Sequence, residues 1–325
     1  MTKQDIIHNI HTLVSHNVIG DKQLINRYKG FKGELSFETY LKSNYNRYKL
    51  LDGGMIFSID SSKSSINNSV YITVTNQINN LNDYINLYSN LHNLDFKHLF
   101  LVVYENKHWE QKPVMIYPNE TIKLPVPKLK IMTYDIENKK FLNTSNSISQ
   151  FTNLFEDLPE RKKSSYPISD TSIEYLLKML NPFDINDLIK IYLNRLFLDG
   201  YIGFSKKKGK ISDIDLILKR PHGEYRLIEI KEKDLAKKII GFGLDTPRLE
   251  DMNTIQTKSK LDYYLTVRHI NNQKDRELIG WKMISINDFS KNVKGQKTTE
   301  GGTGMRSTSS KNPTVICQLK HFKEI

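Results

Sequence analysis

Residues 211–233 constrain the fold of this chain more than any other stretch. Two apolar runs, Ile214–Leu218 and Tyr225–Ile230, flank a polar bend at Arg220–Glu224 that contains Pro and Gly. Runs of Ile, Leu and Tyr on either side of such a bend predict a β-hairpin. A hairpin this rich in aliphatic residues must bury one of its faces. The stretch therefore predicts a β-sheet packed against a core.

Charged side chains interrupt these apolar strands, where Asp, Glu and Lys are normally disfavoured. Asp213 comes just before the first apolar run and Asp215 lies within it. Glu229 lies within the second run and Lys231 directly follows it. Because side chains alternate between the two faces of a strand, each pair shares one face. The aliphatic residues between them point the other way. The hairpin is thus predicted to gather carboxylates and an ammonium group opposite its buried face.

Such a group of charges has a chemical use. Carboxylates held close together repel one another, which makes a bare cluster unfavourable. A divalent cation removes that repulsion, and hard oxygen ligands suit Mg²⁺. Lys231, two residues beyond Glu229, would lie beside the ion and orient or deprotonate a water molecule. The alternative interpretation is an exposed hairpin whose outer face is simply charged.

At these residues the sequence resembles the PD-(D/E)xK nuclease superfamily, which includes most type II restriction endonucleases. The resemblance rests on Asp215, which is followed by three aliphatic residues, and on the run Glu229-Ile230-Lys231. Ile214 stands where the family pattern has proline. It implies that Asp215, Glu229 and the Ile230 carbonyl bind the metal, and that Lys231 acts on the nucleophile. It also implies a core of helix, β-hairpin, third strand, helix and fourth strand.

Two further acids are candidates for the same site. Asp213 is an additional acid without a fixed role in the family, and we include it among the catalytic residues. Asp187 lies on the helix expected before the hairpin, and a helix acid sometimes adds to the metal site in this superfamily. For Asp187 a solvated surface position is the preferred interpretation.

The expected fold class is α/β (α+β), with a restriction-endonuclease-like mixed β-sheet core flanked by helices and an N-terminal mixed α/β domain. The length of 325 residues is enough for two domains. A polar stretch at 142–170 places the boundary near residue 165. Residues 1–165 are expected to serve DNA recognition or dimerisation. Residues 166–325 are expected to form the nuclease domain, with a basic loop at 291–312.

One part of the N-terminal half repeats the order of elements around the hairpin. A helix carrying Glu34 or Glu38 is followed by Asp52-Gly53-Gly54 and a strand, but Thr73 and Thr75 stand where Glu and Lys would be needed. A decayed copy of the nuclease fold is one interpretation. An ordinary α/β arrangement is the preferred interpretation, because a similar order of elements without the site residues cannot catalyse the reaction.

The charge of the chain favours a polyanionic partner. The net charge is +12 and the pI is near 9.4; Lys and Arg that neutralise phosphates release condensed counterions. A bias toward surface lysine without a partner is the alternative. The partner expected beside a nuclease-like hairpin is double-stranded DNA. The residues expected to contact it are Lys233, Arg248, Gln256, Lys258, Lys297, Thr303, Arg306, Ser307 and Lys311.

Several other classes of protein are excluded or disfavoured. No apolar run approaches a membrane span, and the first residues lack a signal-peptide stretch, so no membrane partner and a cytoplasmic location are expected. Cys317 is the only cysteine, which rules out an intrachain disulfide and a multi-cysteine zinc site. The sequence has no Gly-x-x-x-x-Gly-Lys-Ser/Thr loop, so ATP-driven translocation is not expected.

The resulting hypothesis is a Mg²⁺-dependent, sequence-specific DNA endonuclease of the type II restriction class. It would hydrolyse phosphodiester bonds in double-stranded DNA and leave 5′-phosphate ends. Because cutting a duplex usually takes two active sites, a homodimer is expected by analogy. Two alternatives remain: a structure-directed or repair nuclease with the same site, and a basic DNA-binding protein without catalytic activity.

Overall fold

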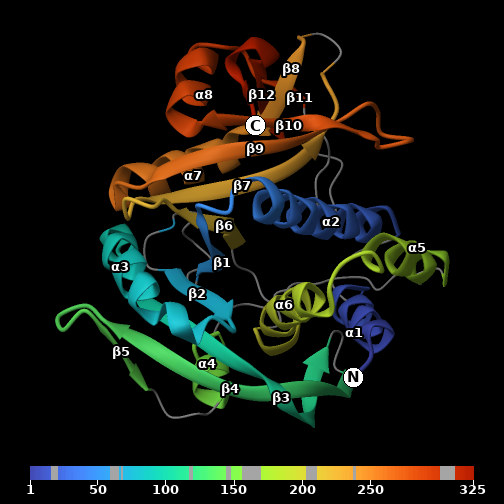
Figure 1. The fold of residues 1–325 in the computed structure, drawn as a ribbon, viewed down its shortest axis with the longest axis vertical. Helices are drawn as coiled ribbons and strands as arrows, with labels where there is room; N and C mark the ends of the chain where they lie inside the picture. The colour runs from blue at the N-terminus through green and yellow to red at the C-terminus, as the bar shows by residue number, and fades with distance from the viewer. Residues whose placement is uncertain are drawn as a thin grey trace. The chain divides into compact units, whose positions relative to one another are not determined.

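In the computed structural model, drawn in Figure 1, the chain forms two compact units. The first consists of residues 1–31 and 54–211, and the second of residues 32–53 and 212–325. The described residues are 1–15, 21–58, 66, 69–116, 120–143, 148–155, 170–202, 211–236, 239–300 and 312–325.

The second unit contains a mixed β-sheet. The order across the sheet is β13 (Lys323–Glu324), β10 (Leu278–Ser285), β9 (Asp262–Ile270), β7 (Tyr225–Lys233), β6 (Ile211–Lys219) and the first half of β1 (Lys49–Ser58). Strands β6 and β7 are antiparallel, β7 and β9 are parallel, and β9 and β10 are antiparallel. The hairpin expected from the sequence is present as β6 and β7, and the expected mixed sheet flanked by helices is confirmed.

Parallel pairing of β7 with β9 requires a crossover, and a helix usually supplies it. Here the crossover contains β8 (Gly241–Asp245) and α7 (Thr246–Ser259). Pro247 occupies the first turn of α7, where the missing amide hydrogen of proline costs nothing. The remaining elements of this unit are α8 (Ile286–Val293), β11 (Thr299–Glu300), β12 (Pro313–Gln318) and the 3₁₀ turn η4 (Leu319–His321). Strands β11, β12 and β8 form a separate three-stranded sheet.

One face of the mixed sheet in this unit packs against the part of α2 (Asp21–Asn44) that begins at Lys32. The aliphatic side chains of the hairpin point to this face, as their alternation predicted. The buried cluster consists of Phe37, Leu41, Leu216, Leu218, Ile228, Ile230 and Trp281. The charged side chains of the hairpin strands at odd-numbered positions are therefore left on the opposite face.

Strand β1 joins the same sheet through a close approach to β6. A Cβ atom on Gly53 would lie 1.7 Å from the Ile214 carbonyl oxygen, so only glycine fits between these strands. The second part of α2, the first half of β1, then β6, β7, β8, α7 and β9 thus follow one another within one unit. A single strand, β1, comes between the helix and the hairpin, where the expected order of helix, hairpin, third strand, helix and fourth strand has none. Residues 59–210 lie between β1 and β6 in the sequence. The helix-and-glycine segment that was interpreted as part of an ordinary N-terminal arrangement thus belongs with the hairpin.

The first unit is also mixed α/β. Its sheet contains the second half of β1, then β2 (Ser69–Thr75), β3 (His98–Ile116), β4 (Glu120–Asp135) and β5 (Lys140–Asn143), with β2 and β3 parallel. Its helical elements are α1 (Lys3–Ser15), η1 (Ile78–Asn80), α3 (Leu81–Leu91), η2 (His92–Leu94), α4 (Ile148–Asn153), α5 (Asp170–Leu180), α6 (Ile185–Arg195) and the π-helical turn η3 (Leu196–Tyr201).

The compact units differ from the sequence segments 1–165 and 166–325. Helices α5 and α6, expected to open the nuclease core, group with the first unit, and Asp187 on α6 lies there too. The boundary expected near residue 165 falls outside the described residues, and a division into those two folding domains stays a prediction. Within the described ranges, no helix combines the length and hydropathy needed to cross a bilayer. Cys317 is a buried free thiol.

Candidate active site

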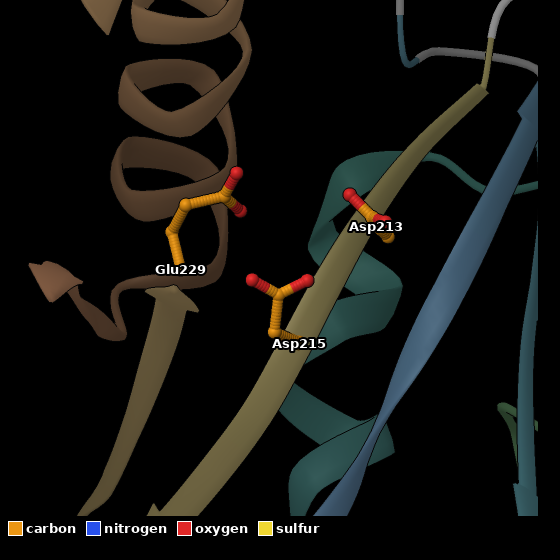
Figure 2. A group of neighbouring side chains, drawn as sticks. All are labelled: Asp213, Asp215 and Glu229. Atoms are coloured by element: carbon orange, nitrogen blue, oxygen red, sulfur yellow. The ribbon is translucent and has the colours of Figure 1, made fainter. Parts of the chain in front are cut away.

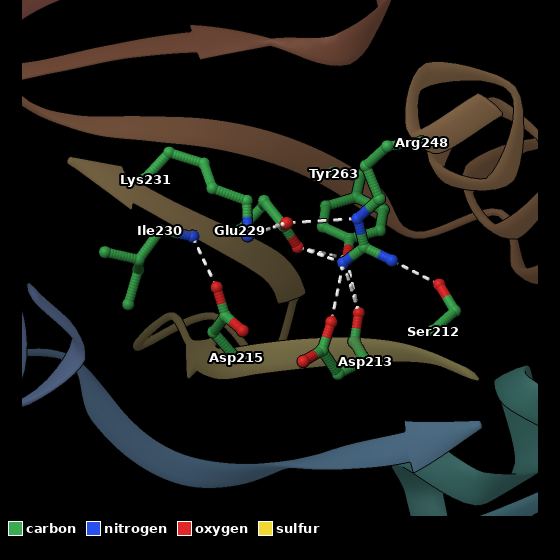
Figure 3. Close-up of polar contacts among 8 residues, drawn as sticks. All are labelled: Ser212, Asp213, Asp215, Glu229, Ile230, Lys231, Arg248 and Tyr263. Atoms are coloured by element: carbon green, nitrogen blue, oxygen red, sulfur yellow. Dashed lines mark hydrogen bonds and ion pairs between the residues drawn. The ribbon is translucent and has the colours of Figure 1, made fainter. Parts of the chain in front are cut away.

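The hairpin strands separate where their acids lie. Backbone pairing of β6 with β7 runs from Lys219 opposite Tyr225 to Leu216 opposite Ile228. At the next position the Ile230 amide donates to Asp215 Oδ2 at 2.6 Å. A side-chain carboxylate thus accepts the hydrogen bond in place of a backbone carbonyl (Figure 3). This opening lets carboxylates from both strands turn toward the space between them.

Three carboxylates converge at this opening (Figure 2). Asp213 and Asp215 on β6 and Glu229 on β7 each offer an oxygen, and these oxygens lie within 4.8 Å of one another. The spatial convergence expected from strand alternation is therefore observed. Carboxylate oxygens at this spacing are the ligands that Mg²⁺ prefers, so the donor set fits a hard divalent cation.

Glu229 is the most enclosed of the three acids, with no exposed surface. Lys231 Nζ lies 2.6 Å from its Oε1, Arg248 Nε donates to Oε1 at 3.0 Å, and Arg248 Nη2 pairs with Oε2. Burial alone would raise the pKa of this carboxyl. The two cations outweigh burial and lower its pKa to about 2. Glu229 is therefore ionised at neutral pH.

Arg248 reaches this cluster from the first turn of α7 (Figure 3). Besides Glu229, its guanidinium donates to the Asp213 carbonyl at 2.5 Å, to Asp213 Oδ1 at 3.2 Å and to the Ser212 hydroxyl. The Tyr263 hydroxyl lies 3.4 Å from Nη2. Burial would lower the pKa of the guanidinium, but Glu229 and its neighbours raise it well above the usual value. Arg248 is thus a fixed positive charge inside the acid cluster.

Sequence reasoning assigned Arg248 to DNA contact and missed its place among the acids. The signal for that place is the Thr-Pro pair that begins α7. It puts Arg248 in the first helical turn, but only the crossover between parallel strands brings that turn to Glu229.

Asp215 and Lys231 respond to the cluster in different ways. Burial, followed by the charge of Glu229, raises the pKa of Asp215 well above its ordinary range, and Lys231 only partly offsets this. Burial would lower the pKa of the Lys231 ammonium, but Glu229, then Asp215 and Asp213, raise it overall. Without a metal ion, Asp215 therefore takes up a proton readily and Lys231 keeps its charge.

Glu34 on α2 is a further acid that acts on the site. Its negative charge contributes to the raised pKa of Asp215. Glu34 was noticed in the sequence as part of the repeated order of elements, but nothing local connected it to the hairpin. Asp187, the helix acid considered from the sequence, lies in the first unit.

The residues expected to contact DNA lie in several environments. Lys233 follows Lys231 on the same face of β7, and burial lowers the pKa of its ammonium although Asp245 opposes the effect. Gln256 is buried; its Nε2 donates to Asn287 Oδ1 at 2.6 Å, and its Oε1 accepts a backbone amide at 3.0 Å. Its expected contact with DNA stays a prediction.

The remaining candidates for DNA contact are spread along the C-terminal part of the chain. Lys258 lies near the end of α7, and Lys297 is exposed between α8 and β11. The other four fall outside the described residues: Thr303, Arg306, Ser307 and Lys311. The Ile230 carbonyl stays a predicted metal ligand; the Ile230 amide, as described above, holds Asp215.

Comparison with known proteins adds little to this geometry. No protein-family model matches the chain, and no curated protein matches it. Among solved structures, one match is Hjc, a Holliday junction resolvase from the archaeal hyperthermophile Archaeoglobus fulgidus. It is 12% identical with a TM-score of 0.20, and the match covers 34% of this chain and 68% of that one. At this level the likeness indicates neither the fold nor the activity of this chain.

Proposed function

We propose that this protein is a Mg²⁺-dependent endonuclease that hydrolyses phosphodiester bonds in double-stranded DNA. The observation that carries the proposal is the convergence of Asp213, Asp215 and Glu229 within 4.8 Å, with Lys231 bonded to Glu229. The basic charge of the chain favours DNA as the substrate. The more specific form of the proposal is a sequence-specific restriction enzyme of type II.

The residues that would hold the metal are Asp215, Glu229 and the Ile230 carbonyl, with Asp213 as an additional oxygen donor. When bound, a divalent ion would lower the pKa of a coordinated water and neutralise charge on the scissile phosphate. An adjacent cation would also favour ionisation of Asp215, whose pKa is otherwise raised. Ionisation of Asp215 is thus expected to depend on the metal.

Lys231 would act as a charged donor. In the metal-free chain, and against the effect of burial, the neighbouring carboxylates raise its pKa and keep a proton on the ammonium at neutral pH. An ammonium at this position can orient the attacking water and stabilise negative charge that develops on the phosphate oxygens. Bond formation from the water oxygen to phosphorus and departure of the 3′ oxygen would leave a 5′-phosphate end.

Arg248 would be a positioning residue. It binds Glu229 through two nitrogens, and such two-point contacts fix the orientation of a carboxylate. It also contacts Asp213, the acid that the family pattern lacks. With Arg248 present, three carboxylates face two cations, which leaves one net negative charge. A site with two acids and one lysine, which the family resemblance implies, has the same net charge.

The test uses the full chain on plasmid DNA with Mg²⁺, Mn²⁺ or EDTA. Discrete fragments with 5′-phosphate ends support sequence-specific cutting. Asp215→Asn and Lys231→Met should abolish cleavage while leaving binding of a duplex measurable. Lys320→Met, at an exposed position of the same unit, serves as the control and should cut normally. Absence of cleavage with every divalent ion, on plasmid, branched and modified DNA alike, would contradict the proposal.

The same experiment separates the other candidates. Cutting of branched or damaged DNA together with indifference to plasmid sequence would assign the site to a structure-directed or repair nuclease. Binding of DNA without cleavage of any substrate would favour the alternative of a basic DNA-binding protein without catalytic activity. The proposed homodimer is measured separately by sedimentation of the protein with and without a duplex, since two active sites per duplex require two chains.

A further inference from the structure

The guanidinium of Arg248 lies between two of the three acids of the cluster (Figure 3). Its Nη2 pairs with Glu229 Oε2, and the same nitrogen lies 3.2 Å from Asp213 Oδ1. Within the described residues it donates to these two carboxylates but not to Asp215, whose Oδ2 accepts the Ile230 amide. The space between Asp213 and Glu229 therefore already holds a positive charge.

Neutral groups also hold this guanidinium in place. Nη2 donates to the Asp213 carbonyl at 2.5 Å, the Ser212 hydroxyl accepts from Nη1, and the Tyr263 hydroxyl lies 3.4 Å from Nη2. None of these contacts involves a carboxylate, so a metal ion that competes for carboxylate oxygens does not release them. We therefore expect Arg248 to keep its position when a metal ion binds.

The acceptor capacity of Glu229 limits how many ions it can share. Each oxygen of a carboxylate accepts about two partners. Oε1 already accepts from Lys231 Nζ at 2.6 Å and from Arg248 Nε at 3.0 Å, and Oε2 accepts from Arg248 Nη2. The single proton of the Tyr263 hydroxyl has a closer acceptor in the Asp213 carbonyl, at 3.2 Å against 3.5 Å to Oε2. Oε2 thus keeps room for one metal ion, and Glu229 cannot bridge two.

The charge of the cluster gives the same limit. Three ionised carboxylates face Lys231 and Arg248, so one divalent ion brings the group to a net charge of +1 and a second ion would bring it to +3. Glu229 has no exposed surface, and charges repel more strongly where water is excluded. Paired metal ions in enzymes lie only about 3.5–4 Å apart. A second ion would therefore be repelled both by the first ion and by the guanidinium.

We propose that Arg248 is a built-in cation that limits the acid cluster to a single divalent ion. The inference rests on the metal site of the proposed function and adds the number of ions that this site accepts. A guanidinium suits this role because it stays protonated and its planar fork can bind a carboxylate at two points. It supplies its charge whatever the concentration of the metal.

The test counts the Mn²⁺ ions that bind to the metal-free full chain without DNA, from the electron paramagnetic resonance signal of the unbound ion. The wild type should bind one ion in the cluster. Arg248→Met and Arg248→Gln should each bind two, and the first should bind at least about tenfold more tightly than in the wild type, because one nearby positive charge is gone. Glutamine keeps a hydrogen-bond donor at this position, should methionine prevent folding. Lys320→Met should behave as the wild type, and Asp213→Asn with Asp215→Asn counts the ions bound outside the cluster.

A charge-balanced variant separates the effect of charge from the loss of contacts. Arg248→Met combined with Asp213→Asn removes one cation and one carboxylate, so the net charge returns to that of the wild type and a single ion should bind. That ion should bind at least about tenfold more tightly than in Asp213→Asn alone. Two ions in the wild type, or one ion in both single Arg248 variants, would overturn the inference.

The number of bound ions is measured without DNA, so it can fail independently of cleavage. A wild type that cuts plasmid DNA but binds two ions keeps the nuclease and overturns the role of Arg248. One ion in the wild type and two in the Arg248 variants, without cleavage of any substrate, supports the role of Arg248 and overturns the nuclease. A wild type that binds no ion in the cluster overturns both.

Discussion

Replacing Arg248 by methionine tests the electrostatic account of the acid cluster most directly. The change removes two bonds to Glu229 and those to Ser212 and Asp213, while the aliphatic part of the side chain is largely kept. Removing one partner of a buried ion pair costs about 3–5 kcal/mol. Because Lys231 still contacts Glu229, we expect the lower end, a loss of about 3 kcal/mol in the free energy of unfolding near neutral pH.

The pKa of Glu229 gives a second estimate. The difference between its ordinary value of 4.5 and about 2 in the folded chain corresponds to about 3 kcal/mol, which Arg248 and Lys231 share. A carboxyl whose folded pKa is lowered stabilises the protein fully above its unfolded pKa, and this contribution disappears as the pH falls toward the folded value. The deficit of Arg248→Met should therefore shrink between about pH 4.5 and about pH 2.

Denaturant unfolding of both chains, near pH 7 and again toward about pH 3, inside the window set by the two pKa values of Glu229, measures this deficit. Adding Mn²⁺ should recover more stability in Arg248→Met than in the wild type, because a cation then replaces the lost guanidinium. Arg220→Met is the matched control; Arg220 pairs with Glu224, which is 63% exposed, and such pairs contribute up to about 1 kcal/mol. Equal stability of Arg248→Met and wild type at neutral pH, or a deficit independent of pH, would refute the reasoning.

Three further changes test other parts of the structure. Asp215→Asn should raise metal-free stability near neutral pH, because burial and Glu229 raise the pKa of this carboxyl and so disfavour its ionised form; melting with and without Mg²⁺ should also show the metal effect lost. Lys231→Met should abolish cleavage in a plasmid assay yet leave duplex affinity within a few-fold of wild type. Gly53→Ala should destabilise by about 1–3 kcal/mol or more, since its Cβ would strike a backbone oxygen of β6; Gly33→Ala, with nothing within 4 Å, should stabilise α2 by up to about 1 kcal/mol in the same denaturation experiment.

The local sequence pattern was sufficient to predict the hairpin and the acid cluster that it carries. The period of two along residues 211–233 determined which side chains the hairpin buries and which it leaves together on the other face. Burial of the aliphatic face and convergence of Asp213, Asp215 and Glu229 both follow from that period. These predictions needed no long-range information, because the turn itself brings the two strands side by side.

What the sequence did not reveal depends on contacts between distant segments. Nothing near Gly53 indicates that β1 approaches β6, because residues 59–210 separate the two strands in the chain. For that reason α2 and β1 were assigned to an N-terminal arrangement, and Glu34 was not linked to Asp215. Arg248 was likewise missed among the acids, because only the parallel crossover from β7 to β9 carries it there.

The two faces of β7 place two similar carboxylates in different surroundings. On one face Glu229 is bound by Lys231 and Arg248, and on the other Glu232 is bound by two arginines. The neighbours decide the difference. Beside Glu229, two aspartates from β6 return the balance to negative, which suits a metal ion. Glu232 instead pairs with Arg268 and Arg276 on the face that packs against α2. Alternation along a single strand therefore places one carboxylate in the proposed metal site and the other among arginines on the opposite face of the sheet.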